Sequence, residues 1–143
     1  MFELHPQLAN DCITVGDFPL SRLLLMNDAH YPWCILVPRV PRVTEVFELD
    51  DADQQRLAAE SAMLSRLLSD EFAADKMNVA ALGNVVSQLH VHHVVRYRDD
   101  AAWPAPIWGR LPVKPCSALQ LRERLDRLAS ILPADFKFAE TEL

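Results

Sequence analysis

The chain has 143 residues with a formal net charge of −6 at pH 7, and half of its residues are hydrophobic. This length suits one domain, residues 1–143, and the acidic balance argues against extended binding to DNA or RNA, which depends on many cationic contacts to phosphates. No stretch approaches the roughly 18 uninterrupted apolar residues of a membrane helix, and the N-terminus has no basic start, so we expect neither a membrane span nor a signal peptide.

The first third of the chain predicts three strands. Residues 12–18 (CITVGDF) contain β-branched residues and end near the turn pair Gly16-Asp17. Residues 21–27 (SRLLLMN) follow closely enough to complete a hairpin. Residues 33–39 (WCILVPR) form a continuous apolar run, as in a strand that is buried on both faces.

A helix, two strands and a last helix are predicted next. Asp51 is the expected N-cap of a helix that runs to about Phe72, with Gln54 at its third position. Strands are predicted at 76–82 and 88–97.

The last helix is expected to begin at Ser117, with Gln120 at its third position. The order of the elements predicts an α+β domain, with an antiparallel sheet and helices packed on one face.

Three of the five histidines lie within QLHVHHVV, at the start of the predicted strand 88–97. Because side chains alternate along a strand, Gln88, His90 and His92 share one face, at a spacing of about 7 Å, and His93 lies on the other. Imidazole has a free pKa near 6.5 and acts as nucleophile, base or donor at neutral pH. This face of the strand therefore suits phosphoryl or nucleotidyl transfer.

QLHVHHVV resembles the signature of the histidine triad (HIT) superfamily, in which histidines alternate with apolar residues. The resemblance covers about residues 12–98, because LLLMNDAHYPWCILVPR and KMNVAALGN also resemble strands of that family. The segment RYRDDAAWPAPIWG looks typical of a bacterial branch. The Pro-rich segment and the helix within residues 99–143 complete the expected single domain.

The resemblance implies a homodimeric α+β fold that binds nucleotides. It also implies that the middle histidine attacks an α-phosphate, and that water then cleaves the nucleotidyl-histidine. In this alignment His90 is the nucleophile, and His92 donates to a non-bridging phosphate oxygen or to the leaving group. Gln88 replaces the first histidine of the triad. Its side chain cannot titrate, but it can orient His90 by hydrogen bonding.

Two asparagines are expected to contact the nucleotide. Asn27 matches the family position that contacts ribose hydroxyls, and Asn84 lies near one that approaches phosphate. For Asn27, the alternative is a cap of a turn with Asp28. Trp103 and Trp108 are expected to pack in the core, or one of them to line a base pocket.

Arg96 and Arg98 alternate onto the face of His90 and His92 and are expected to meet distal phosphates. The alternative for both arginines is a salt bridge with Asp99 or Asp100. His93 is expected to pack on the core side or at the dimer contact.

The predicted function is a cytoplasmic nucleotide hydrolase or nucleotidyl transferase. Its substrate would be a dinucleoside polyphosphate or a nucleoside phosphoramidate. The reaction needs no cofactor, although Mg²⁺ would accompany a polyphosphate. The expected partners are the nucleotide-type substrate and a second copy of the chain, with no nucleic acid and no membrane. Three cysteines without a CxxC pair fit a reducing compartment.

Three alternatives stay open. The first is a nucleotide-binding module with little turnover. In the second, His90 and His92 ligate a metal, with a third ligand from His30, Cys34, Cys116 or an acid. The third is a shifted alignment, in which His90 is the first triad residue and His92 the nucleophile.

Overall fold

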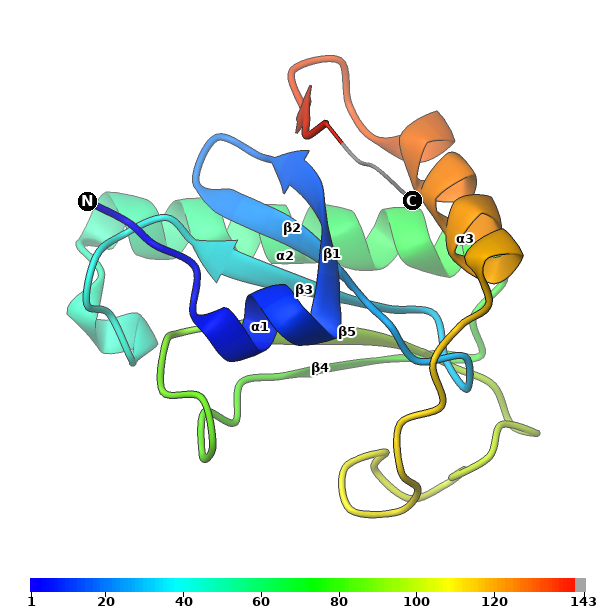
Figure 1. The fold of residues 1–143 in the computed structure, drawn as a ribbon. Helices are drawn as coiled ribbons and strands as arrows, with labels where there is room; N and C mark the ends of the chain where they lie inside the picture. The colour runs from blue at the N-terminus through cyan, green and yellow to red at the C-terminus, as the bar shows by residue number, and fades with distance from the viewer. Residues whose placement is uncertain (141–143) are drawn as a thin grey trace.

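The computed structural model describes residues 1–140, in which six strands form one antiparallel sheet in the order β4-β5-β3-β2-β1-β6 (Figure 1). The strands are β1 (Cys12–Asp17), β2 (Ser21–Met26), β3 (Trp33–Pro38), β4 (Lys76–Ala80), β5 (Val91–Arg96) and β6 (Lys137–Phe138). The helices are α1 (Pro6–Asp11), α2 (Asp51–Phe72) and α3 (Ala118–Ile131), with a short 3₁₀ turn, η1, at Val46–Glu48. The prediction of an α+β fold with an antiparallel sheet is confirmed.

Each face of the sheet carries its own apolar core. α2 runs along one face, behind the sheet in Figure 1, where Leu64, Leu68 and Phe72 pack against Leu23 and Leu36. Fully burying one such side chain stabilises the fold by roughly 1.5–3 kcal/mol. Leu128 of α3 belongs to the same core, so both long helices cover this face of the sheet.

The other face is covered by less regular structure. Leu8 of α1 packs there against Met26, Trp33 and Ile35, together with Ile107 from the long segment after β5. In Figure 1, α1 lies in front of the sheet. Helices were expected on one face only, and the short helix α1 departs from this expectation. A helix of six residues is too short to be stable alone, so its contacts with the sheet hold it in place.

The predicted elements agree with the structure apart from their ends. Ser117 caps α3 with Gln120 in a capping box, as expected. The cap of α2 was placed one residue too late, because Asp50 rather than Asp51 accepts the hydrogen bond from the N–H of Asp53. The strand predicted at 88–97 is shorter at its start, since β5 begins at Val91.

The register of β5 decides where the histidines lie. His92 pairs with Ile35, and His93 pairs with Cys34, so both lie in the middle of the sheet beside β3. His92 points to the face that α1 covers, with His90 next to it. His93 points to α2, where its ring meets the hydroxyl of Ser61.

Within residues 1–140, no helix is both long and apolar enough to cross a membrane.

Candidate active site

The rings of His90 and His92 form a close pair at the start of β5. Their centroids lie 4.9 Å apart with the planes at 72°, an edge-to-face arrangement. Each residue is only 7 % exposed. The alternation predicted from the sequence therefore brings these two rings together on one face, in a mostly buried position.

The hydrogen bond at Nδ1 of His90 determines its tautomer. This nitrogen lies 2.6 Å from the main-chain oxygen of Gln88. A carbonyl oxygen only accepts, so Nδ1 must carry the proton and donate it. In the neutral ring, Nε2 of His90 then has a free lone pair, which is what a nucleophile requires.

His92 has the opposite tautomer. The indole Nε1 of Trp33 lies 3.0 Å from Nδ1 of His92. An indole N–H only donates, so Nδ1 of His92 is the acceptor and Nε2 carries the proton. Burial, and then the neighbouring rings of His90 and His93, lower the pKa of His92 from 6.5 to about 3. At neutral pH, His92 is thus an uncharged donor.

The third neighbouring histidine belongs to the core. His93 is fully buried, and its Nδ1 donates to the carbonyl of Val91 at 3.0 Å. Its Nε2 accepts from the hydroxyl of Ser61 at 2.7 Å. Burial lowers the pKa of His93 to about 4. This placement agrees with the expected packing role.

A hollow with apolar walls, the aromatic hollow, has a volume of about 430 Å³ and borders both His90 and His92. The indole of Trp108 meets the ring of His92 edge-on at 5.2 Å and that of Trp33 at 6.2 Å. Asn84 also borders this hollow. Its lining comprises Gln7, Leu8, Asp11, Cys12, Met26, Trp33, Ile35, Leu82, Gly83, Asn84, Val85, Val86, His90, His92 and Trp108.

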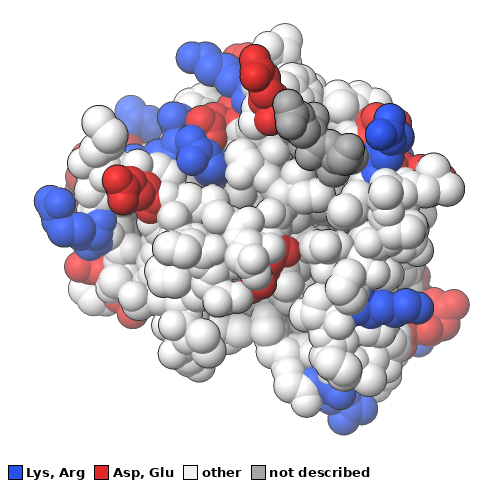
Figure 2. All heavy atoms as spheres, in the orientation of Figure 1, with Lys and Arg blue, Asp and Glu red and all other residues white. Residues whose placement is uncertain are grey.

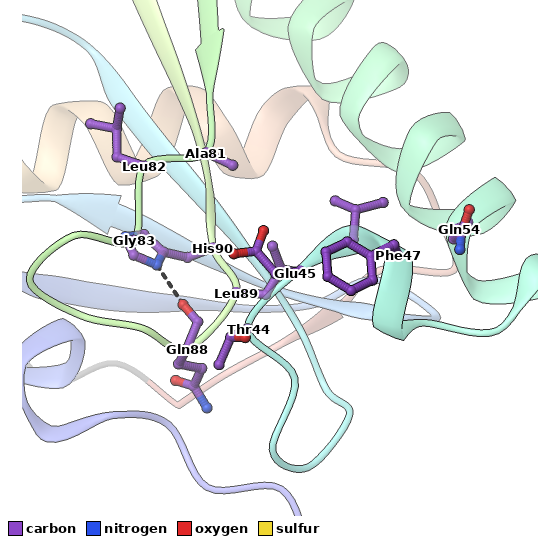
Figure 3. Close-up of a pocket in the computed structure, with 11 residues that line it drawn as sticks. Thr44, Glu45, Phe47, Gln54, Ala81, Leu82, Gly83, Gln88, Leu89 and His90 are labelled. Atoms are coloured by element: carbon purple, nitrogen blue, oxygen red, sulfur yellow. Dashed lines mark hydrogen bonds between the residues drawn. The ribbon is translucent and has the colours of Figure 1, made fainter.

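A second hollow, the Glu45 hollow, borders His90 as well and has a volume of about 350 Å³. In Figure 3, His90 lies beside the segment from Ala81 to Gly83. The opposite wall of the hollow includes Glu45 and Phe47, from the segment before α2. The lining comprises Thr44, Glu45, Val46, Phe47, Gln54, Ala81, Leu82, Gly83, Gln88, Leu89 and His90. His90 thus borders two spaces that also share Leu82 and Gly83.

The charged side chains that line the two hollows beside His90 are acidic. Among the described residues, neither hollow is lined by a lysine or an arginine, whereas Asp11 borders the aromatic hollow and Glu45 the second one. Figure 2 agrees, since Lys and Arg gather toward the margins of the face that carries α1. These two linings offer no cation to a bound polyphosphate, although Arg42 borders a third hollow that shares Thr44 and Gln88 with the Glu45 hollow.

The two arginines that the sequence suggested lie elsewhere. Arg96 is 1 % exposed, and its guanidinium donates to Asp100, Asn78 and the carbonyl of Ala105. Arg98 is exposed and lies 3.7 Å from Asp75. In this conformation Arg96 cannot reach a ligand, because the protein itself occupies and buries its guanidinium.

The two asparagines are separated. Asn84 lines the aromatic hollow, but Asn27 borders a smaller space beside it, of about 230 Å³. The side-chain oxygen of Asn27 accepts from the N–H of Cys116 at 2.8 Å, which ties β2 to the segment before α3. Asp11 and Met26 border both spaces, so Asn27 lies next to the aromatic hollow rather than in it.

Gln88 does not use its side chain to orient His90, contrary to the expectation from its triad position. Its main-chain carbonyl holds the ring instead. The side-chain amide accepts from the N–H of His5 and donates to the carbonyl of Glu3, each at 2.8 Å.

Trp33, Asp11 and Glu45 are residues of this site that the sequence pattern did not indicate. The sequence shows Trp33 only as an aromatic residue at the start of the predicted strand 33–39, and its contact with His92 depends on the register of β3 against β5.

Among residues 1–140, no group of three or more His, Cys, Asp or Glu side chains is arranged to hold a metal ion.

The antiparallel sheet with a histidine pair on one strand defines a class of protein, and comparisons with known proteins identify the same class. The family model described as HIT domain matches residues 7–99. The chain therefore belongs to the HIT family, as the resemblance of QLHVHHVV implied.

Solved structures of bacterial histidine triad proteins are similar over nearly their whole length. One from Marinobacter aquaeolei VT8 has 49 % identity and a TM-score of 0.90, covering 92 % of this chain and 96 % of its own. One from Bradyrhizobium japonicum has 42 % identity and a TM-score of 0.89, covering 91 % and 97 %. One from Sinorhizobium meliloti 1021 has 39 % identity and a TM-score of 0.89, covering 92 % and 97 %. A comparison with curated proteins finds no match.

Proposed function

We propose that this HIT-family protein is a hydrolase or nucleotidyl transferase that acts at the α-phosphate of a nucleotide conjugate through His90. One observation carries the proposal, namely the opposite tautomers of the paired rings. His90 has a free lone pair on Nε2, and His92 has a proton on Nε2. A nucleophile and a neutral donor thus lie side by side. The shifted alignment is disfavoured, because Nε2 of His92 carries a proton and has no lone pair to attack with.

The proposed reaction has two displacements at phosphorus. Nε2 of His90 attacks, a P–N bond forms, and the bond to the leaving group breaks, with the leaving group taking its electron pair and a proton from solvent. Water then attacks the nucleotidyl-histidine and loses a proton to solvent, the P–N bond breaks with its electron pair returning to Nε2, and the nucleoside monophosphate leaves. The N–H at Nε2 of His92 donates to a non-bridging oxygen, where negative charge builds up in each transition state.

The surroundings of His90 favour one of the two expected substrate classes. The aromatic hollow, with Trp33 and Trp108, suits a nucleobase. The absence of Lys and Arg from both linings disfavours a polyphosphate leaving group, which would keep several negative charges near Asp11 and Glu45. A nucleoside phosphoramidate with a neutral or cationic amine avoids this repulsion. Mg²⁺ would be the counter-ion of a polyphosphate substrate, and the proposed steps do not use it.

The test compares turnover of adenosine 5′-phosphoramidate and of a dinucleoside polyphosphate, each with and without a chelator. We expect faster turnover of the phosphoramidate, unchanged by the chelator, and its loss in the variant His90→Ala. Binding of nucleotide without any product release would support the binding module instead. Turnover that disappears with the chelator would support the metal-dependent alternative.

Two further expectations stay part of this proposal. We propose a homodimer, supported by the exposed edge strand β4, whose Val79 is half exposed. We propose a cytoplasmic location, supported by the free thiols of Cys12, Cys34 and Cys116. Molecular mass in solution and cell fractionation check these two points.

A further inference from the structure

The side chain of Gln88 makes a paired contact with the start of the chain. Its Oε1 accepts from the N–H of His5, and its Nε2 donates to the carbonyl of Glu3, each at 2.8 Å. The carbonyl of one residue and the N–H two positions later face the same side of an extended segment. The amide of Gln88 thus pairs with residues 3–5 as the peptide group of a neighbouring strand would.

Few side chains can make this paired contact. It needs an acceptor and a donor side by side at the end of a flexible stem, which a primary amide provides. A carboxylate lacks the donor, and asparagine is shorter by one methylene group. The donor and acceptor nitrogens of a neutral histidine diverge around a rigid ring. Glutamine in place of the first triad histidine is therefore matched to the N-terminal segment.

The same residue also fixes the nucleophile. The main-chain oxygen of Gln88 accepts from Nδ1 of His90 at 2.6 Å, which determines the tautomer of that ring. The side chain and the carbonyl of one residue thus connect the N-terminal segment to His90. A backbone movement of Gln88 would disturb both contacts, because its side chain and the main-chain oxygen that holds the ring belong to the same residue.

The segment held by Gln88 leads directly into a wall of the site. Residues 3–5 precede α1, from which Gln7, Leu8 and Asp11 line the aromatic hollow. α1 has only six residues, so its position depends on its contacts, among them buried Leu8 and the neighbouring pair at Gln88.

We propose that Gln88 is a positioning residue that couples the N-terminal segment to His90, so that the wall of the aromatic hollow and the tautomer of the nucleophile are set together. The consequence for turnover rests on the proposed function, whereas the coupling itself does not. Loss of the amide is expected to loosen residues 3–8 and to release the ring of His90 from its single tautomer.

The first experiment measures amide exchange and ring ¹⁵N shifts by NMR in Gln88→Leu, which keeps the size of the side chain and removes both hydrogen bonds. We expect exchange of the His5 amide to rise roughly tenfold or more, and the His90 ring to become a mixture of tautomers. Gln55→Leu is the matched control, because Gln55 is exposed on α2. An unchanged His5 amide, or an unchanged His90 ring, would overturn the coupling.

A double-mutant cycle isolates the contact with His5. The φ of His5 is −56°, which proline adopts, so His5→Pro removes the N–H with little strain. His5→Ala also removes the imidazole but keeps the N–H. We expect Gln88→Leu to change amide exchange across α1 less in the His5→Pro background than in the wild type. In the His5→Ala background its effect should equal that in the wild type. Equal effects in both backgrounds would show that the two residues are not coupled.

The third measurement is turnover of the phosphoramidate by Gln88→Leu. A displaced nucleophile is expected to lower kcat/KM by roughly 10- to 100-fold, and a loosened wall to raise KM as well. Loss of the His90 tautomer with kcat/KM at the level of Gln55→Leu would contradict the role in turnover while leaving the coupling in place. If the wild type does not turn over any substrate, the proposed function fails, and the NMR results alone decide the coupling.

Discussion

The indole N–H of Trp33 donates to Nδ1 of His92 across 3.0 Å, between neighbouring strands of the sheet. Trp33 pairs with Val94, and His92 pairs with Ile35, so the two side chains are diagonal neighbours on one face. This contact leaves the only ring proton of His92 on Nε2. An aromatic side chain of β3 thus determines which way a histidine of β5 can donate.

Trp33→Phe removes this donor while keeping an aromatic ring. We expect His92 to become a mixture of tautomers and kcat to fall roughly tenfold, the equivalent of one net hydrogen bond. Ring ¹⁵N shifts and kcat measure the two effects. Trp108→Phe is the control for the tautomer, because Trp108 contacts the same ring edge-on without a hydrogen bond to it. A single Nε2–H tautomer in Trp33→Phe would contradict the assignment.

His92→Ala gives the upper limit of that effect. Removing one donor that stabilises charge in a transition state lowers kcat by roughly 10²–10³. The loss in Trp33→Phe should be smaller, because the ring of His92 remains. A kcat in His92→Ala that equals the wild-type value would remove His92 from the mechanism.

The buried histidines predict how stability depends on pH. Burial lowers the pKa of His93 from 6.5 to about 4, so the unfolded chain binds a proton at a higher pH than the folded one. This contribution is complete above pH 6.5 and is lost as the pH falls toward 4. We expect the free energy of unfolding to drop between pH 7 and pH 4.5 by on the order of 2–3 kcal/mol from His93 alone.

Denaturant unfolding across this pH range measures that slope. His93→Gln cannot titrate but can still donate and accept, so it should reduce the pH dependence and leave the contribution of His92, even if it lowers the stability at pH 7. Equal slopes in the variant and the wild type would show that His93 is not the titrating group.

Arg96 and Arg98 are predicted to differ in their roles. Arg96→Met leaves the buried carboxylate of Asp100 without its cation, which is expected to lower stability by roughly 3–5 kcal/mol. Arg98→Ala removes an exposed pair and should change stability by less than about 1 kcal/mol. Thermal unfolding measures both changes. A normal stability with a raised KM in either variant would restore the ligand role that the sequence suggested.

The sequence predicted those parts of the fold that depend on local pattern. Strand alternation placed His90 and His92 on one face and His93 on the other, and the apolar run 33–39 gave the central strand β3. Helix α3 begins where the Ser117 cap predicted. These features follow from periodicity and capping, which neighbouring residues determine.

The contacts that complete the site could not be predicted in this way. The bond from Trp33 to His92 depends on the register of two strands, and that from Gln88 to His5 joins residues 83 positions apart. Helix α1 is too short for a periodic signal. Strand alternation places Arg96 on the face of His90 and His92, as for a site residue. Its guanidinium is buried instead, because it donates to Asp100 in the turn that follows β5.

The most direct test of the central claim is the covalent intermediate on His90. A phosphoramidate substrate labelled in its nucleoside is mixed with enzyme, quenched rapidly at alkaline pH to preserve the P–N bond, and mapped by mass spectrometry. We expect one nucleotidyl group on the peptide that contains His90, and neither adduct nor turnover in His90→Ala. Turnover that persists in His90→Ala, or an adduct on another residue, would contradict the proposed mechanism.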